Sequence, residues 1–382
     1  MVFCMKILVT GSNGFIGSNL IARLKSMGQE NIIYAYDMNV SMETLREYTK
    51  DCDFVYHFTA VHRTNRIEDF MEVNYLFFKE LLCMLEENHN TCPVLYTSSI
   101  QAMQDTEYAQ SKRMAEEVLK EYAKKTGARG IIYRLTNTFG KWAKPGGHSV
   151  VATFCHNIAR NEKIEIHNPD TVMNFYYIDD VIDSFVHQLK EEAGADADGI
   201  YRLEDTLLYS ISLKELAEKI YSFKASRENH TLPDMKDVLT KKLYSTYLSY
   251  LQPTDFKYPL ISNKDSRGSF TEIFKTEERG QISVNVIKPG VKKGEHFHNT
   301  KCEKFLVVSG EAKIQFRKIG TNEILNYYVS SKKMEVVDIP PGYTHNIINE
   351  GISDCVTLIW ANEVFNKDKP DTYFRPVNID DM

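Results

Sequence analysis

The sequence predicts a doubly wound α/β domain built on a parallel sheet, followed by an all-β barrel domain. Two observations support this prediction. Up to about Lys190, short β-branched apolar runs alternate with longer stretches of helical spacing, which is typical of parallel βαβ units. From about Leu260, short strand-like runs follow one another closely with Gly and Pro between them, which is typical of a small barrel or jelly roll.

The first half is expected to supply the parallel sheet. Helical spacing separates its strands, for example over Ser18–Gly28 and Met71–Asn88. His57 lies inside an apolar run and is expected to be a core histidine with satisfied hydrogen bonds. The expected strands are Ile7–Val9 within Lys6–Thr10, Ile32–Tyr36, Phe54–Phe58, Val94–Thr97 and Gly130–Arg134.

The second half is expected to form the barrel. A tyrosine-rich segment between the halves ends in Gln252-Pro253 and Tyr258-Pro259, where proline stops the preceding helix. The expected domains are therefore residues 1–257 and 258–382. The expected barrel strands are Ser283–Ile287, Phe305–Val308, Ala312–Phe316, Glu335–Ile339 and Val356–Trp360.

Length and composition exclude several classes of protein. A chain of 382 residues favours two domains. With 46 basic and 52 acidic residues the net charge is −6, so we expect no nucleic-acid partner. The apolar runs are shorter than the roughly 18 to 20 residues that a membrane span needs, so we expect no membrane partner. Seven scattered cysteines without a CxxC pair indicate a reducing compartment, and we expect a cytoplasmic protein.

A glycine-rich turn follows the first strand and leads into a helix expected over Ser18–Met27. Glycines at this spacing allow a tight turn and close approach of the backbone to a pyrophosphate, which the helix N-terminus then attracts. The turn therefore predicts a dinucleotide site. Its expected cofactor-binding residues are Gly11, Gly14, Phe15, Ile16 and Gly17.

Two acidic residues are expected to contact the same dinucleotide. Asp37 closes the second strand, where a carboxylate can bond the ribose 2′-hydroxyl and favour NADH over NADPH; the alternative is that Asp37 only begins a turn. Asp53 leads the third strand and is expected near the adenine.

Catalytic residues are expected after the fourth strand. Tyr108 and Lys112 are four residues apart, so they share one helical face. The ammonium is expected to lower the phenol pKa, hold the cofactor ribose and make Tyr108 a general acid for a carbonyl oxygen. A serine at the strand end, Ser99 or alternatively Ser98, is expected to bond the same oxygen.

These motifs together resemble the extended short-chain dehydrogenase/reductase family, which acts on nucleotide-activated sugars. The resemblance covers about residues 5–250 and includes Arg134 to Gly140, similar to the family's RxxNxxG segment, and Tyr177 to Val181. It implies a Rossmann-type fold, a catalytic triad of Ser99, Tyr108 and Lys112, and substrate contacts from Ser99 and Asn137. Ile100 and Gln101 stand where sugar 4,6-dehydratases carry an acidic pair, so dehydratase activity is not expected.

The second half carries a metal-ligand pattern. His296 and His298 are two residues apart, so in a strand they point to one side. With Glu303 and His345 they can form a three-histidine, one-carboxylate shell suited to Zn, Mn, Fe or Ni. The alternative is a metal-free barrel whose histidines pack or act as bases. The spacing resembles the cupin family over residues 258–382, although Met334 stands where the second motif usually begins with glycine.

The fusion of the two halves resembles a family of bifunctional enzymes of capsular polysaccharide precursor synthesis. Three stretches carry the likeness, namely Leu243–Leu251, Asp265–Glu272 and Gly342–Ile347. The resemblance implies a UDP-activated 2-acetamido-2,6-dideoxy-4-keto-hexose as substrate, C3 epimerisation in the cupin and C4 reduction in the first domain. The implied product is UDP-2-acetamido-2,6-dideoxy-L-talose.

The expected cofactors are NADPH or NADH and a divalent metal, with Zn preferred because it is redox-silent. A homodimer is also expected. The alternative function is a single-activity 4-keto-sugar reductase whose cupin only dimerises or senses a ligand.

Overall fold

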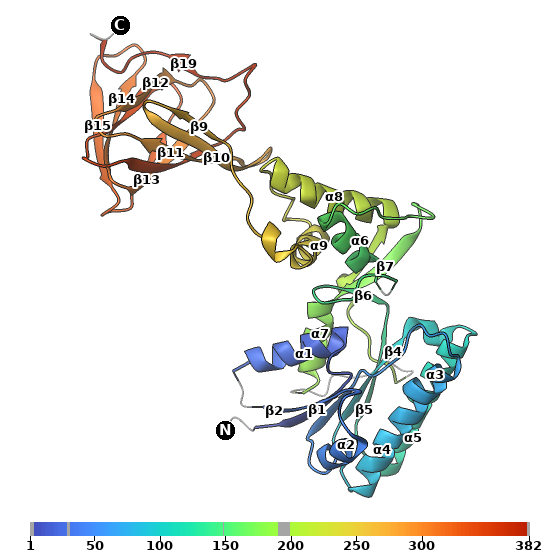
Figure 1. Ribbon diagram of the computed structural model, residues 1–382. Helices are drawn as coiled ribbons and strands as arrows, with labels where there is room; N and C mark the ends of the chain where they lie inside the picture. Colours follow the sequence, from blue (N-terminus) through green and yellow to red (C-terminus); the bar gives the residue numbers. More distant parts are fainter. Residues whose placement is uncertain (1–3, 29–30, 148, 190–198, 380–382) are drawn as a thin grey trace. The chain divides into compact units, whose positions relative to one another are not determined.

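The computed structural model describes residues 4–28, 31–147, 149–189 and 199–379. The chain divides into two compact units, each assembled from two segments (Figure 1). The sequence-based division at residues 257/258 falls close to this partition and stays a prediction. The first unit comprises Met1–Tyr221 with Lys236–Gln252, and the second comprises Ser222–Met235 with Pro253–Met382.

The first unit is built on a five-stranded parallel sheet with the order β2-β1-β3-β4-β5. The chain passes from β1 to β2 on one side and then returns to β3 on the other. A switch point therefore lies between β1 and β3, and in such sheets ligands bind at the carboxyl ends of the strands there. The strands are β1 (Lys6–Thr10), β2 (Ile32–Tyr36), β3 (Phe54–His57), β4 (Val94–Ser99) and β5 (Gly130–Leu135).

Helices cover both faces of this sheet, which confirms the doubly wound prediction (Figure 1). Alternate side chains of a strand point to opposite faces. Leu8 accordingly packs in the core shared with α2 (Met42–Tyr48), α4 (Phe77–Glu87) and α5 (Glu107–Thr126). Its neighbours Ile7 and Val9 pack in the core shared with α1 (Phe15–Ser26) and α7 (Ile178–His187).

Two sequence predictions about this unit need adjustment. Helix α1 begins at Phe15, three residues before the predicted start, because the last glycine of the turn is already helical. The helix predicted over Met71–Asn88 is interrupted by a π-helical turn, η1 (Glu72–Leu76), between α3 (Glu68–Met71) and α4.

His57 is fully buried as predicted, and its Nδ1 lies 2.8 Å from Thr10 Oγ1, although Nε2 lacks a partner among the described residues.

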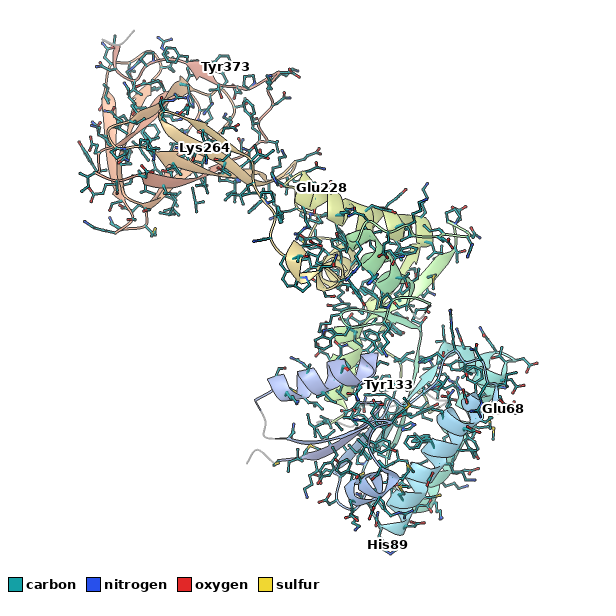
Figure 2. All side chains as sticks on the ribbon, viewed as in Figure 1. Glu68, His89, Tyr133, Glu228, Lys264 and Tyr373 are labelled. Atoms are coloured by element: carbon teal, nitrogen blue, oxygen red, sulfur yellow. The ribbon has the colours of Figure 1, made fainter. Side chains whose placement is uncertain are left out.

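The remaining elements before the barrel include a small three-stranded sheet with the order β6-β7-β8. Tyr133 of β5 is buried within the first unit, where Ser184 and Gln188 bond its hydroxyl (Figure 2). No described helix has the length and apolar character needed to cross a membrane. The elements are η2 (Ile100–Met103), β6 (Asn137–Phe139), α6 (Val150–Ala159), β7 (Val172–Tyr177), η3 (Asp205–Leu207), β8 (Leu208–Ser212), α8 (Leu213–Glu228), α9 (Val238–Ser249) and η4 (Pro253–Asp255).

The second unit consists of two antiparallel sheets with a shared apolar core, which confirms the all-β prediction. The sheet orders are β16-β13-β18-β11-β10-β9 and β15-β14-β17-β12-β19. The strands are β9 (Ser262–Asp265), β10 (Gly268–Thr276), β11 (Gly280–Ile287), β12 (Lys292–Phe297), β13 (Glu303–Ser309), β14 (Glu311–Lys318), β15 (Ile324–Ser330), β16 (Val336–Ile339), β17 (Tyr343–Asn349), β18 (Cys355–Ala361) and β19 (Tyr373–Phe374).

The five predicted barrel strands are present as β11, β13, β14, β16 and β18. A strand through His296 and His298 was expected from their spacing, but its bounds were not predicted, because the residues of β12 are mostly polar and show no apolar alternation; the strand ends at Phe297, before His298. Its pairing with β17 and β19 holds it in the sheet instead. This strand carries the first metal-ligand candidate.

Candidate active site and candidate metal centre

The glycine turn has the geometry of a cradle for a phosphate group. Gly11 has φ +67°, and a Cβ atom there would lie 2.9 Å from the backbone of Phe58 and Thr59. A Cβ atom on Gly17 would lie 2.3 Å from the Gly11 carbonyl oxygen. Both positions therefore require glycine. Gly14 caps helix α1, and the first helical turn from Phe15 carries no acidic residue, so its N–H groups can receive an anion.

Asp37 lies beside this turn, as predicted. Its carboxylate accepts hydrogen bonds from the backbone N–H groups of Asn13 at 2.8 Å and Met38 at 2.9 Å. Asp37 directly follows β2, so it lies at the carboxyl-terminal ends of the strands, where the glycine turn also begins.

The prediction that Asp53 contacts the adenine is wrong. Asp53 precedes β3, and its carboxylate accepts a hydrogen bond of 2.7 Å from the N–H of Lys6 at the start of β1. In a parallel sheet all strands begin on one side of the sheet and end on the opposite side. Asp53 therefore lies at the amino-terminal ends of the strands, whereas the glycine turn lies at their carboxyl-terminal ends.

Helix α5 brings Tyr108 and Lys112 together next to the end of β4. Thr106 caps the helix by accepting from the N–H of Ala109 at 3.1 Å. The Lys112 ammonium group donates to the Thr97 carbonyl at 3.1 Å, and Nζ lies 5.9 Å from the centre of the Tyr108 ring. Lys112 is only 1% exposed, and no carboxylate of the described residues contacts its amine directly.

The pKa values differ from the sequence prediction that Lys112 lowers the pKa of Tyr108. Burial raises the pKa of the Tyr108 phenol, and the neighbouring Ser99 hydroxyl offsets part of this increase. Burial also lowers the pKa of Lys112 to about 7, against a smaller opposing effect of the Glu116 charge. The lysine thus loses much of the charge with which it would stabilise a phenolate.

The two candidate serines have different partners. The Ser98 hydroxyl donates to Glu116 at 2.5 Å, and Arg134 binds both oxygens of that carboxylate at 2.9 and 2.6 Å. Ser99 accepts from the N–H of Gln101 at 3.1 Å and neighbours Tyr108. The geometry therefore favours Ser99 over Ser98 as the partner of Tyr108.

Asn137 lies at the same edge of the sheet as Ser99. Ser99 is paired with Leu135 at the end of β5, and Asn137 begins β6 two residues later. The Asn137 side chain is exposed and donates to the Asn174 carbonyl at 3.3 Å. It is therefore accessible to a ligand at the carboxyl ends of the strands.

Two residues near Tyr108 were not predicted from the sequence. The Nδ1 atom of His62 lies 3.1 Å from the Tyr108 hydroxyl oxygen. Asn74, in the π-helical turn, is fully buried and bonds both Val61 and Ser111. The only sequence signal for His62 was its place shortly after the third strand, where loops of such folds carry functional residues.

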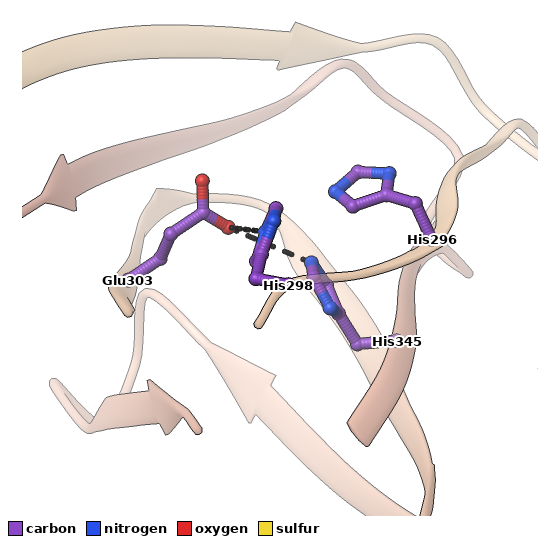
Figure 3. Close-up of side chains that lie close together, drawn as sticks. All are labelled: His296, His298, Glu303 and His345. Carbon is purple, nitrogen blue, oxygen red and sulfur yellow. Dashed lines mark ion pairs between the residues drawn. The ribbon is translucent and has the colours of Figure 1, made fainter. Parts of the chain in front are cut away.

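The second unit brings together all four predicted metal ligands, His296, His298, Glu303 and His345 (Figure 3). One potential ligand atom from each lies within 4.8 Å of the others. The Nε2 atoms of His298 and His345 are 3.4 and 3.5 Å from the same oxygen of Glu303. This arrangement fits a divalent metal with a mixed imidazole and carboxylate shell.

Local backbone geometry directs His296 towards the other ligands. A bulge in β12 between Gly294 and His296 shifts the register against β17, and Glu295 has φ +64°. A Cβ atom on Gly294 would lie 2.9 Å from the Asn346 backbone. After the bulge, His296 is paired with His345, so the two rings lie 4.6 Å apart.

The protonation of these residues also suits a metal. Burial and the neighbouring imidazoles lower the pKa of His296 to about 3, so its ring is neutral at physiological pH. Burial alone would raise the pKa of Glu303, but the imidazoles of His298 and His345 outweigh it and hold the pKa well below its usual value. A neutral His296 ring and an ionised Glu303 carboxylate are the forms in which these two residues bind a metal.

A second layer of contacts orients the ligands. His298 Nδ1 lies 2.7 Å from the Asp371 carbonyl oxygen, which assigns the proton to Nδ1 and leaves the Nε2 lone pair facing the cluster. His298 Nε2 and both nitrogens of His345 have no hydrogen-bond partner among the described residues, although these rings are fully buried. Such buried orphan atoms are expected where a metal completes the site.

Known proteins resemble both halves. Residues 7–203 match the model of the NAD dependent epimerase/dehydratase family, and residues 263–373 match the polysaccharide biosynthesis C-terminal domain. A UDP-2-acetamido-2,6-beta-L-arabino-hexul-4-ose reductase of Pseudomonas aeruginosa is 42% identical over 369 residues, which cover 97% of this chain and 98% of the relative.

Solved structures show the same likeness. The crystal structure of the capsular polysaccharide assembling protein CapF from Staphylococcus aureus is 43% identical, with a TM-score of 0.90 over 97% of this chain and all of CapF. A UDP-glucose 4-epimerase from Thermotoga maritima shares the fold of part of the chain, at 17% identity and a TM-score of 0.52 over 64% of it. The chain therefore belongs to the NAD dependent epimerase/dehydratase family and, over its whole length, to its CapF-like members.

Proposed function

We propose that this protein is a bifunctional nucleotide-sugar enzyme of capsular or surface polysaccharide precursor synthesis. Its substrate is a UDP-2-acetamido-2,6-dideoxy-4-keto-hexose. The second unit, acting as a metal-dependent cupin, inverts C3, and the first unit then reduces C4 to give UDP-2-acetamido-2,6-dideoxy-L-talose. The observation that carries the proposal is the likeness, over 97% of the chain, to a relative named as the reductase of a UDP-activated 4-keto sugar.

The geometry of the first unit supports the reduction step. The bound nicotinamide cofactor supplies hydride to C4. Tyr108 donates its phenolic proton to O4, and the Ser99 hydroxyl bonds the same oxygen. The raised pKa of Tyr108 keeps the phenol protonated and ready to act as the acid. Lys112 positions the ribose, and Asn137 contacts the substrate from the start of β6.

Cofactor choice between NADH and NADPH depends on Asp37. Its carboxylate lies at the carboxyl end of β2, next to the glycine turn. A ribose 2′-hydroxyl can donate to a carboxylate, whereas a 2′-phosphate is repelled by it. We therefore propose that the enzyme accepts NADH at least as well as NADPH.

The second unit supports the epimerisation step. Its His296, His298, Glu303 and His345 would hold a divalent metal, and we propose Zn. A bound metal supplies a Lewis acid that polarises a carbonyl oxygen. The C4 ketone acidifies the C3 proton, so a base can remove this proton and return it to the opposite face. Reduction must follow, because the C3 proton is no longer acidic once C4 is an alcohol.

A second candidate function is reduction alone, with a cupin that dimerises or senses a ligand. The observation that favours it is the name of the Pseudomonas aeruginosa relative, which mentions only a reductase. We propose a homodimer under either function. Exposed side chains of the edge strand β15, including Tyr327 and Tyr328, are suitable for contact with a second copy.

The proposal is tested by incubating the metal-loaded enzyme with the 4-keto-6-deoxy UDP-N-acetylhexosamine and NADH or NADPH. We expect oxidation of the nicotinamide and a product with the talo configuration in proton NMR. The matched variants separate the steps, because Tyr108→Phe should stop reduction and Glu303→Gln should stop epimerisation. Failure of the wild-type enzyme to oxidise either nicotinamide with this sugar would refute the proposal.

A further inference from the structure

His62 contacts the group that acts as the acid in the proposed reduction. It lies on the segment after β3, and its side chain is exposed. Its Nδ1 atom is 3.1 Å from the Tyr108 hydroxyl oxygen, and the ring centres are 5.8 Å apart. This is a hydrogen-bond distance between two groups that can both exchange protons.

A buried amide holds the two partners in place. Asn74 accepts from the N–H of Val61 at 2.7 Å and donates to its carbonyl at 3.1 Å, immediately before His62. The same side chain donates to the Ser111 hydroxyl at 3.1 Å, which in turn donates to the Tyr108 carbonyl at 2.8 Å. One fully buried side chain in a π-helical turn thus connects the backbone at both residues, and π-turns occur frequently at functional sites.

The proposed reduction requires a proton source of this kind. Each turnover removes the phenolic proton of Tyr108, which must return before the next one. The Lys112 ammonium group donates to the Thr97 carbonyl at 3.1 Å and makes no hydrogen bond to the phenol oxygen among the described residues. His62 instead contacts both the phenol oxygen and water.

We propose that His62 is the proton shuttle between solvent and Tyr108, an inference that rests on the proposed reductase function. As hydride reaches C4, the Tyr108 O–H bond breaks and the sugar O4–H bond forms. The resulting phenolate takes the Nδ1 proton of the His62 imidazolium, which restores the phenol and leaves a neutral imidazole. Solvent water then returns a proton to His62, so no further reactant is needed.

The test compares first and later turnovers in His62→Ala. Because Tyr108 begins each experiment protonated, we expect a first turnover within about threefold of wild type. Later turnovers should be about a hundredfold slower, within the range typical of general acid catalysis. Added imidazole should restore much of the steady-state rate, since it can occupy the vacated space. A role in positioning Tyr108 alone would slow the first turnover equally and show no rescue.

The control is His89→Gln. His89 is also exposed, but it follows the carboxyl end of α4 and leads to the start of β4, at the sheet edge opposite Tyr108 (Figure 2). The rates of the first and later turnovers in His89→Gln should match those of the wild-type enzyme. An unchanged steady-state rate in His62→Ala, or the absence of imidazole rescue, would overturn the shuttle while leaving the reductase intact. Inactivity of wild type with the keto sugar would instead refute the proposed function.

Discussion

The buried amine of Lys112 makes the stability of the first unit depend on pH. Its pKa is about 7 in the folded protein and 10.5 in an unfolded chain, so the unfolded state binds more protons between these values. Stability therefore rises as the pH increases through this range. At about 1.4 kcal/mol for each pH unit, the free energy of unfolding increases by about 5 kcal/mol between the two pKa values. Solvent does not screen this contribution, because the side chain is buried. About 2 kcal/mol of it falls between about pH 7 and about pH 8.5.

The perturbation is Lys112→Met, which keeps the apolar stem and removes the titrating amine. Urea unfolding of the nucleotide-free protein is followed by the fluorescence of Trp142, with Trp360→Phe in both backgrounds so that the signal reports the first unit. We expect the free energy of unfolding to increase by about 2 kcal/mol more in the lysine protein than in the methionine variant over this pH range. Other titrating groups are common to both proteins and cancel.

Two results would refute this reasoning. Equal pH dependence in both proteins would mean that Lys112 is not desolvated in the folded state. A stability that falls with pH only in the lysine protein would mean that a carboxylate partner holds the amine charged.

Three further predictions address the chemistry. Tyr108→Phe should lower the rate of C4 reduction by about a hundredfold or more and leave C3 exchange unchanged, as measured by NMR; unimpaired reduction would exclude Tyr108 as the acid. Glu303→Gln should reduce the bound metal measured by elemental analysis at least tenfold and leave the nicotinamide affinity unchanged. Asp37→Ser should shift the ratio of the Kd values by about tenfold in favour of NADPH over NADH, whereas Asp53→Ala should change neither Kd. A wild-type preference of a hundredfold for NADPH would contradict the role of Asp37.

Much of the fold could be predicted because the relevant signals are local. The strands β1 to β5 combine apolar β-branched residues with flanking turns, and β2 was predicted with its observed ends. The bounds of β12 could not be predicted, because its register is set by pairing with β17 rather than by its own polar residues. The four candidate metal ligands were still identified, because their residue types and spacing carry the signal.

The errors in the candidate site arise from long-range geometry. Asp53 was misplaced because an acid next to a strand does not reveal at which edge of the sheet it lies, and its bond to Lys6 joins two strand starts. His62 and Tyr108 are separated by 46 positions, so no local pattern joins them. The pKa of Tyr108 was predicted to shift downwards, whereas it shifts upwards. The sequence shows the nearby lysine but not the burial of both groups.

The central claim is that two activities act in a fixed order on one sugar. The most direct test is proton NMR of the 4-keto-6-deoxy UDP-N-acetylhexosamine with the metal-loaded enzyme in D₂O, before and after adding NADH or NADPH. We expect loss of the C3 proton signal without nicotinamide, followed by a new C4 proton signal once nicotinamide is present. Reduction of C4 without prior exchange at C3 would contradict it and leave a reductase joined to a non-catalytic barrel.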